Sequence, residues 1–293
     1  MMSLVLLLVA CQKEPSPGGS EFSGSIGALP GLFIINDSGD QVYFSQGNLQ
    51  YQASTRTWRF AEHQWDYVGN DNQNISSTYS GWIDLFGWGT SGYRHGAVCY
   101  RPWSISTEYS DYYAYGSSAK DLYEQTGKAE WGYNRISNGG KTERQWRTLT
   151  GGSNSEWSYV LYTRGTDSGI RYAKGQVNGV NGVILVPDDW SASTYALSTT
   201  NSIGASYASN IISQSEWTSV LEPAGCVFLP AAGYRSGTSV SIAGFYGLYW
   251  SSSCGNSSDA YYVYFGGGGL YAHESYGNYR YYGRSVRLVR DAR

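Results

Sequence analysis

Short runs of alternating apolar and polar residues recur along this 293-residue chain, a pattern typical of β-strands that bury one face. The runs at 31–35 and 41–45 flank a turn-forming segment at 36–40 and predict a β-hairpin. Further short strands are predicted at 49–52 and 58–61. Between 66 and 115 the chain is rich in Gly, Ser, Asn and aromatic residues, so we expect long loops there. The aromatic side chains expected to pin these loops are Trp82, Phe86, Trp88 and Trp103.

Two segments carry the sequence signals of a helix start. Ser153 and Glu156 have capping-box spacing, and Ser213 and Glu216 repeat it. Each box precedes apolar residues that share one helical face, namely Trp157, Val160 and Leu161 in the first segment and Trp217, Val220 and Leu221 in the second. We therefore predict two amphipathic helices.

An apolar strand is expected after each helix, at 182–187 and at 225–230. Asn-Gly pairs at 178–179 and 181–182 predict two turns ahead of the first of these strands. Two helices among many short strands predict an α+β fold with twisted antiparallel strands and long loops, rather than a doubly wound sheet.

The segment 244–283 is the most unusual part of the chain. It holds ten Tyr and nine Gly but only three fully charged residues, Asp259, Glu274 and Arg280. A period of two puts Tyr261, Val263, Phe265, Leu270 and Ala272 on one face and Tyr262, Tyr264, Tyr271 and His273 on the other. The first face is apolar enough to be buried. The second face is predicted to point outward and to bind a ligand.

Composition disfavours some classes of function. The chain has 20 basic and 23 acidic residues, a net charge of −3, which argues against a binder of nucleic-acid phosphates. Many Tyr and Gly with few charges are typical of recognition surfaces rather than of active sites.

The N-terminus has the features of a bacterial lipoprotein signal. An apolar run at 4–9 is too short to span a bilayer but suits the core of a secretion signal. The Leu-Val-Ala-Cys sequence at 8–11 resembles a lipobox, which implies a signal peptide over 1–10, lipidation of Cys11 and a Gly-, Ser- and Pro-rich tether over 11–30. Gln12 rather than Asp after the cysteine favours the outer membrane. The alternative is a buried apolar strand at the N-terminus.

Three C-terminal motifs resemble those of a known family. They are Phe-Leu-Pro-Ala-Ala-Gly-Tyr-Arg at 228–235, Gly-Leu-Tyr-Trp-Ser-Ser-Ser at 247–253 and Arg-Tyr-Tyr-Gly-Arg-Ser-Val-Arg at 280–287. Together they resemble the lipoprotein-borne C-type-lectin-like domains related to the formylglycine-generating enzyme superfamily. The ending is similar to the variable proteins of diversity-generating retroelements. The resemblance covers about 32–293 in pieces, and implies a C-type-lectin-like domain over 31–293 with a variable region at about 245–283.

In that family an error-prone reverse transcriptase randomises adenines, so that Asn codons become codons for Tyr, Ser, Gly, His, Asp, Leu or Cys. The resemblance then implies that the outward positions bind the ligand, namely Leu248, Cys254, Asn256, Tyr262, Tyr264, Tyr271, His273, Ser275, Tyr276, Asn278, Tyr279, Tyr281 and Tyr282. Glu274 does not fit, because adenine changes cannot convert AAC into a Glu codon. The residues between these positions, such as Trp250, Ser251 and Phe265, match the invariant scaffold.

The predicted function is therefore ligand binding by an exported lipoprotein displayed at the cell surface, without a catalytic site, metal or other cofactor. The expected partner is a protein or glycan on another cell, a phage or a host surface, and the membrane is contacted through the lipid anchor. The closest alternative is a fixed carbohydrate-binding adhesin without diversification, since Tyr and Trp also stack on sugars.

Catalytic hypotheses find little support. The related oxidases hold copper on a pair of nearby cysteines, whereas Cys226 and Cys254 are far apart in sequence. A hydrolase is disfavoured by a total of three His and by the absence of a Gly-x-Ser-x-Gly motif. Cys99, Cys226 and Cys254 allow one disulfide at most.

Three other polar features have plain structural interpretations. Asp188 and Asp189 could be a catalytic or calcium-binding pair, but we favour a strand end followed by a helix cap. The glycines at 266–269 lack the Lys-Ser/Thr of a phosphate loop and predict a hairpin tip. Arg280 and Arg287 are expected in buried ion pairs or in hydrogen bonds to loop carbonyls rather than on an anion.

Overall fold

The computed structural model describes residues 26–123, 128–140, 142–274 and 279–292. About 15% of the chain is helical and 30% is in strands of small antiparallel sheets, which confirms the α+β class. The predicted signal peptide, Cys11 and most of the tether lie outside the described residues, as do Ser275, Tyr276 and Asn278.

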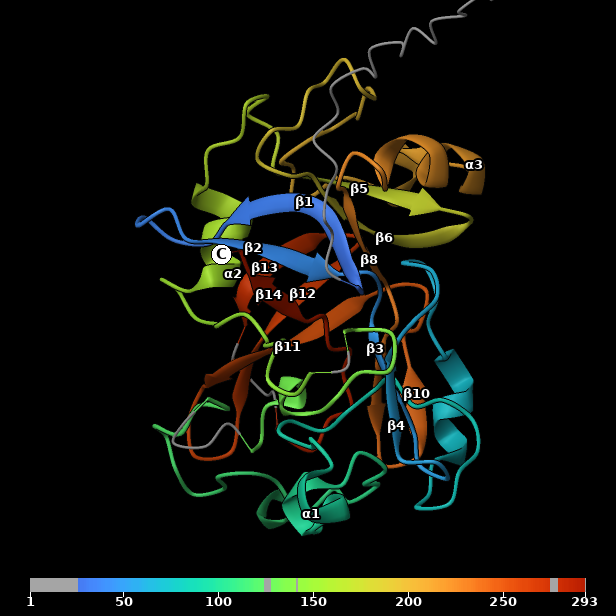
Figure 1. Cartoon of the computed structure of the whole chain (residues 1–293), viewed down its shortest axis with the longest axis vertical. Helices are drawn as coiled ribbons and strands as arrows, with labels where there is room; N and C mark the ends of the chain where they lie inside the picture. Colours follow the sequence, from blue (N-terminus) through green and yellow to red (C-terminus); the bar gives the residue numbers. More distant parts are fainter. Residues whose placement is uncertain (1–25, 124–127, 141, 275–278, 293) are drawn as a thin grey trace, which may run out of the picture.

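Within the described residues, the strands are grouped into five small sheets (Figure 1). The sheets are β1 (Ala28–Ile34), β2 (Gln41–Ser45) and β14 (Val289–Asp291); β3 (Leu49–Gln52) and β4 (Thr57–Phe60); β7 (Ile211–Ile212), β5 (Tyr172–Val177), β6 (Val180–Leu185) and β8 (Val227–Pro230); β9 (Tyr234–Ser236) and β10 (Ser239–Ser241); and β11 (Gly247–Cys254), β12 (Ala260–Gly266) and β13 (Gly269–Glu274).

Helical segments are short. They are η1 (Gly69–Asn74), α1 (Tyr93–Gly96), η2 (Val98–Tyr100), η3 (Tyr109–Asp111), η4 (Trp131–Tyr133), α2 (Glu156–Ser158) with η5 (Tyr159–Thr163), η6 (Tyr207–Ser209), and α3 (Gln214–Glu216) with η7 (Trp217–Leu221). Figure 1 shows α3 and α1 at opposite ends of the molecule. Among the described residues, no helix is long and apolar enough to cross a membrane.

The two ends of the described chain meet in one sheet. β2 lies between β1 and β14, and the C-terminal residues lie beside α2 in Figure 1. The predicted hairpin is confirmed, but β1 begins at Ala28 and buries Leu29. The prediction that the tether continues to residue 30 is therefore wrong, because the apolar Leu29 side chain packs into the core.

The predicted helices are both present, and each α-helical turn continues as a wider π-type turn. At Ser213 the capping box is complete, with Ser213 and Glu216 each bonding the other's backbone N–H. The first box is wrong by two residues, since Ser155 rather than Ser153 caps α2. The Glu156 carboxylate instead accepts hydrogen bonds from Arg147 and from the Thr150 N–H.

One of the two predicted Asn-Gly turns is confirmed. Asn178 and Gly179 both have positive φ and join β5 to β6, as a type I′ turn requires. Asn181 and Gly182 lie inside β6 instead. Gly182 is needed there because a Cβ atom would meet the ring of Phe228 at 2.4 Å.

The core consists of three hydrophobic clusters. The first joins the β1–β2–β14 sheet, α2 and the inner face of β11–β12–β13, where Val263, Phe265, Leu270 and Ala272 are buried as predicted. The second lies on the opposite face of β11 and contains side chains from the long loops, and the third packs α3 and η7 on β5, β6 and β8. Phe86 and Trp88 of the predicted loop anchors are fully buried, while Trp82 and Trp103 are half-buried.

Asp188 does not cap a helix. The chain makes a turn after β6, and the Asp188 carboxylate accepts hydrogen bonds from the buried Arg164 guanidinium at 2.7 Å and from the Ile34 N–H at 2.7 Å. Asp188 therefore ties β1 to the end of β6, and the predicted helix start at this position is wrong.

A buried lysine holds the tip of the β12–β13 hairpin, which the four glycines form as predicted. The Lys174 Nζ atom donates to the carbonyls of Ile203 (2.6 Å), Gly266 (2.6 Å) and Gly269 (2.9 Å). Removal from water disfavours the charged amine and lowers the pKa of Lys174 to about 8.

Replacement of Lys174 by Met should lower the free energy of unfolding by about 2 kcal/mol or more at pH 7, because three carbonyls, two of them in buried hydrogen bonds, lose their donor. The folded protein binds the Lys174 proton less tightly than the unfolded chain does. Wild-type stability should therefore rise relative to Lys174→Met between pH 8 and pH 10. Urea unfolding of both proteins across this pH range measures the difference in their free energies of unfolding. A difference that does not change with pH would contradict the lowered pKa of Lys174.

Candidate functional site

The predicted ligand-binding face belongs to the β11–β12–β13 sheet and the segment that follows it. All eight residues of β11 are buried, so this strand is covered on both faces. Two hydrogen bonds attach the loop segment at 86–88 to β11. The Trp88 indole N–H donates to the Ser251 carbonyl (2.9 Å), and the Trp250 indole N–H donates to the Phe86 carbonyl (2.7 Å). Exposure increases across the sheet towards β13, where Tyr271 is 37% exposed.

Three predicted contact residues are therefore in the wrong place. Leu248, Cys254 and Tyr262 are only 5%, 9% and 7% exposed and belong to the second hydrophobic cluster. Their burial follows from the loops that pack on this face, a layer that strand alternation cannot predict. The expectation that these three side chains point into solvent is wrong.

The other described positions lie at the surface. Tyr264, Tyr279, Tyr281 and Tyr282 are half-buried, and Tyr271 and Asn256 are exposed. β13 includes His273, but the position of its side chain lies outside the described part of the structure. Five of the thirteen predicted residues thus bring tyrosine side chains to the surface, and we call Tyr264, Tyr271, Tyr279, Tyr281 and Tyr282 the tyrosine surface.

These tyrosines form two groups of packed rings. Tyr264 stacks on Tyr271, its neighbour across the β12–β13 pair, with ring centroids 6.0 Å apart. Tyr279, Tyr281 and Tyr282 pack together with centroid distances of 4.7–6.0 Å. Ring-to-ring packing limits side-chain motion, so little conformational entropy remains to be lost when a partner binds.

A buried arginine packs on Tyr262 of β12 and on Tyr282 of the second group. The Arg284 guanidinium is 3.6 Å from the ring centroid of Tyr262 and 5.7 Å from that of Tyr282, and it also covers Trp250 at 4.3 Å. Burial lowers the pKa of Arg284 to about 10, so it stays charged at neutral pH. Tyr262 therefore supports the tyrosine surface from below through a cation–π contact.

Arg280 fixes the segment that carries Tyr279 and Tyr281. Its guanidinium is 1% exposed and donates to the carbonyls of Tyr113, Ser117, Asn256 and Asp259 and to the Cys254 sulfur. Hydrogen bonds to loop carbonyls are the role predicted for this residue. Arg287 donates instead to the side-chain oxygens of Asn48 (3.3 Å) and Gln64 (2.7 Å).

Asn256 is exposed, but its amide is used by its own turn. The Oδ1 atom accepts from the N–H groups of Ser258 (2.8 Å) and Asp259 (2.9 Å), and Nδ2 donates to the Asp259 carboxylate at 2.8 Å. Asn256 therefore shapes the loop rather than offering free hydrogen-bonding groups.

The surroundings favour the protonated phenol at two of these tyrosines, Tyr264 and Tyr281. Partial burial, followed by the neighbouring phenols, raises the pKa of Tyr264 to about 12 and raises that of Tyr281 further. A hydrogen bond to Tyr279 is the largest cause of the raised pKa of Tyr109. The surface is thus rich in hydroxyl groups.

The sequence analysis missed four aromatic residues at this site. Tyr246 stacks on Tyr264 at 5.4 Å and Tyr109 packs on Tyr279 at 4.8 Å, while Tyr234 contacts Tyr282 at 5.3 Å and Phe245 is 68% exposed. Tyr246 could have been found, because it precedes Leu248 by two residues and shares its strand face. Tyr109 comes from a distant loop and carries no local signal.

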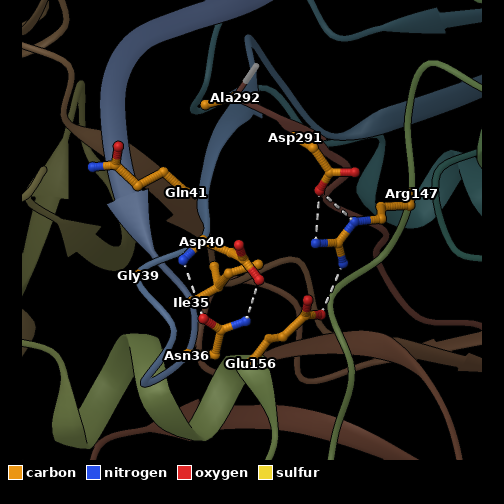
Figure 2. Close-up of a pocket in the computed structure, with 9 residues that line it drawn as sticks. All are labelled: Ile35, Asn36, Gly39, Asp40, Gln41, Arg147, Glu156, Asp291 and Ala292. Carbon is orange, nitrogen blue, oxygen red and sulfur yellow. Dashed lines mark hydrogen bonds and ion pairs between the residues drawn. The ribbon is translucent and has the colours of Figure 1, made fainter.

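A polar cavity of about 550 Å³ lies at the end of the β1–β2–β14 sheet, where the turn between β1 and β2 meets the last residues of β14 (Figure 2). Its only lining cation, Arg147, is 2.8 Å from both Glu156 and Asp291. These ion pairs fasten β14 to the start of α2, and they raise the pKa of Arg147 above its usual range despite the opposing effect of burial. The lining groups satisfy one another, so we assign this cavity a structural role.

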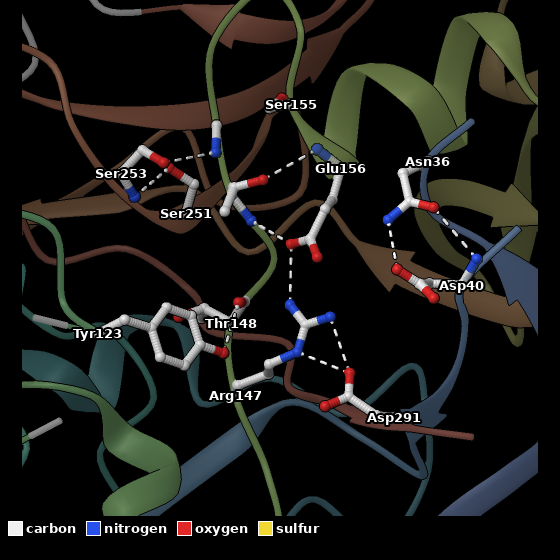
Figure 3. Close-up of polar contacts among 12 residues, drawn as sticks. Asn36, Asp40, Tyr123, Arg147, Thr148, Ser155, Glu156, Ser251, Ser253 and Asp291 are labelled. Atoms are coloured by element: carbon white, nitrogen blue, oxygen red, sulfur yellow. Dashed lines mark hydrogen bonds and ion pairs between the residues drawn. The ribbon is translucent and has the colours of Figure 1, made fainter. Parts of the chain in front are cut away.

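The same network reaches the back of β11 (Figure 3). The Gly151 N–H donates to Ser253 Oγ at 3.1 Å, and the Ser253 N–H donates to Ser251 Oγ at 3.2 Å. Tyr123 also donates to the Thr148 carbonyl at 3.3 Å. β11 is therefore held by hydrogen bonds to two separate segments, the one at 86–88 and the one at 151.

The cysteines do not form a shared site in the structure. Cys226 is buried in the third cluster and Cys254 in the second, and Cys99, Cys226 and Cys254 are all unbridged. Burial raises the pKa of each thiol. Within the ranges described above, no three His, Cys, Asp or Glu side chains come together as a metal site would require.

Comparisons with known proteins do not identify the chain. No family model, curated protein or solved structure matches it. The geometry of the tyrosine surface and its supports therefore carries the functional argument.

Substitutions on β12 and β13 should separate supporting from contacting tyrosines. Tyr262→Ala should lower the free energy of unfolding by about 3 kcal/mol, because a buried ring and its contact with Arg284 are lost. Tyr271→Ala, at an exposed position, should change it by less than about 0.5 kcal/mol. Urea unfolding measures both free energies. Equal losses of stability would contradict the assignment of Tyr262 to the support and of Tyr271 to the contact surface.

Proposed function

We propose that this protein is an exported, lipid-anchored binding protein that recognises macromolecular partners through its tyrosine surface. The observation that carries the proposal is the placement of five packed, partly exposed tyrosines on and beside a sheet in which all of β11 and most described residues of β12 and β13 are buried. Such rings offer large contact area at low entropic cost, together with hydroxyl groups that both donate and accept hydrogen bonds.

We further propose that the domain has a C-type-lectin-like fold and that a diversity-generating retroelement varies the tyrosine surface. The motifs at 228–235, 247–253 and 280–287 support this proposal, as does the gathering of five surface tyrosines within 264–282. Burial restricts the set of positions that can vary without cost. Leu248, Cys254 and Tyr262 belong with the scaffold, and Tyr264, Tyr271, Tyr279, Tyr281 and Tyr282 remain as contact positions.

Sequencing the gene and its flanking DNA in several isolates tests diversification. We expect a reverse transcriptase gene and a near-copy of the segment coding for 250–287 that differs from it only at adenines. Variation should concentrate at Tyr264, Tyr271, Tyr279, Tyr281 and Tyr282, because changes there leave the core intact. An invariant gene without a template copy would contradict the proposal and favour a fixed carbohydrate-binding adhesin.

Lipid anchoring has a separate test. In a bacterium that processes lipoproteins, the wild-type protein should partition into the detergent phase of a Triton X-114 extraction, and Cys11→Ala should move it to the aqueous phase. Cys99→Ala is the matched control and should not change the partition. A wild-type protein found in the aqueous phase would contradict lipidation but leave binding by the tyrosine surface untouched.

A further inference from the structure

A second cavity, of about 420 Å³, lies among β3, β4, α1 and the end of η4. Unlike the tyrosine surface, this cavity is lined by several positively charged side chains. The lining residues are Tyr51, Arg56, Trp58, Gly92, Tyr93, Arg94, His95, Tyr133, Asn134, Arg135 and Glu143. A volume of this size is within the range of small-molecule sites.

Positive charge is concentrated at this cavity although the whole chain carries −3. The exposed side chains of Arg56, Arg94 and Arg135 line it, against one carboxylate, Glu143. Two more cations lie over the lining rings, Lys128 at 5.1 Å from the Tyr93 centroid and Arg144 at 5.0 Å from that of Tyr133. An excess of fixed cations in a concave site attracts an anionic ligand.

The backbone holds several of these side chains in unusual positions. Arg56, Arg94 and His95 have φ values of 55°, 49° and 58°, the left-handed region that costs about 1 kcal/mol for a residue with a Cβ atom. Arg56 Nη1 lies 3.2 Å from His95 Nδ1. Because a guanidinium has no acceptor, His95 Nδ1 is the acceptor in this contact.

The cavity floor is aromatic, with hydrogen-bonding groups that point to a polar ligand. The rings of Tyr51 and Trp58 are 4.5 Å apart, and Trp58 Nε1 has no hydrogen-bond partner among the described residues. Asn134 Nδ2 donates to the carbonyls of Ser91 (2.7 Å) and Trp131 (3.0 Å), which leaves its Oδ1 atom as an acceptor. A donor and an acceptor thus accompany the guanidinium groups.

We propose that this cavity binds an acidic sugar, with its carboxylate on Arg56 and Arg94. Arginine matches a carboxylate in charge and in planar geometry, and Trp58 Nε1 and Asn134 Oδ1 suit sugar hydroxyls. The rings of Tyr93 and Tyr133 are nearly perpendicular, at 89°, so they do not form the parallel slot that a nucleotide base would fill.

The adjoining surface extends the site. A shallower cavity of about 270 Å³ shares Arg56, Trp58 and Arg135 with the first. A chain of more than one acidic sugar could therefore contact the same arginines on both sides of Trp58. The positive potential is also felt by Tyr93, whose pKa lies below its ordinary value chiefly because Arg94, and then Lys128, bond its hydroxyl.

Calorimetric titration of the protein with trigalacturonate, and with maltotriose as the neutral sugar of equal length, tests this site. We expect binding of trigalacturonate that weakens as NaCl is added, and at least tenfold weaker binding of maltotriose. Arg56→Gln and Arg94→Gln should each weaken trigalacturonate binding at least fivefold. Both side chains are exposed, so these variants should fold.

Lys120→Gln is the matched control, because it removes one exposed positive charge outside the cavity and should leave the affinity unchanged. Tyr271→Ala should also leave it unchanged, which separates this site from the tyrosine surface. Equal binding of the two trisaccharides, tighter binding of AMP than of trigalacturonate, or unchanged affinity in both arginine variants would overturn the proposal, as would no binding of trigalacturonate.

Discussion

Buried arginines that donate to backbone carbonyls are the interaction on which this fold depends. Segments without regular secondary structure contain carbonyl groups that must find donors once they are buried. Arg164, Arg235 and Arg280 supply these donors, and each binds carbonyls from at least two separate segments. A guanidinium offers five donors in a fixed plane and stays charged when buried, so one side chain can join several loops at once. Lys174 performs the same task at one hairpin tip.

This mode of crosslinking explains how long loops can support a defined surface. Arg280 fixes the turn beneath Tyr279 and Tyr281, and Arg284 supports Tyr262 and Tyr282 from inside the domain. The exposed rings can then differ in identity while the groups that position them remain unchanged. The side chains of a surface can vary without loss of the fold when the residues that support the surface are separate from those that contact the partner.

The two proposed sites differ in their chemistry. The tyrosine surface consists of aromatic rings with hydroxyl groups, which suits a large partner. The cavity near α1 is concave and positively charged, and the side chains of its arginines are exposed. Charge in this protein therefore has two uses, in buried groups that hold the chain together and in exposed groups that concentrate at one cavity.

Local sequence patterns determined the α+β class, the hairpin at 31–45, the two helices and the buried side of β12 and β13, because periodicity and capping act over a few residues. The composition of 244–283 likewise marked the segment that presents tyrosines. Only the tertiary structure decided which of those side chains are exposed. Trp88, Phe86 and the segment at 121–122 cover the second face of β11, so Leu248, Cys254 and Tyr262 are buried although alternation places them outward. Alternation assigns a residue to a face of a strand, but long-range packing decides whether that face meets water or another layer of the protein.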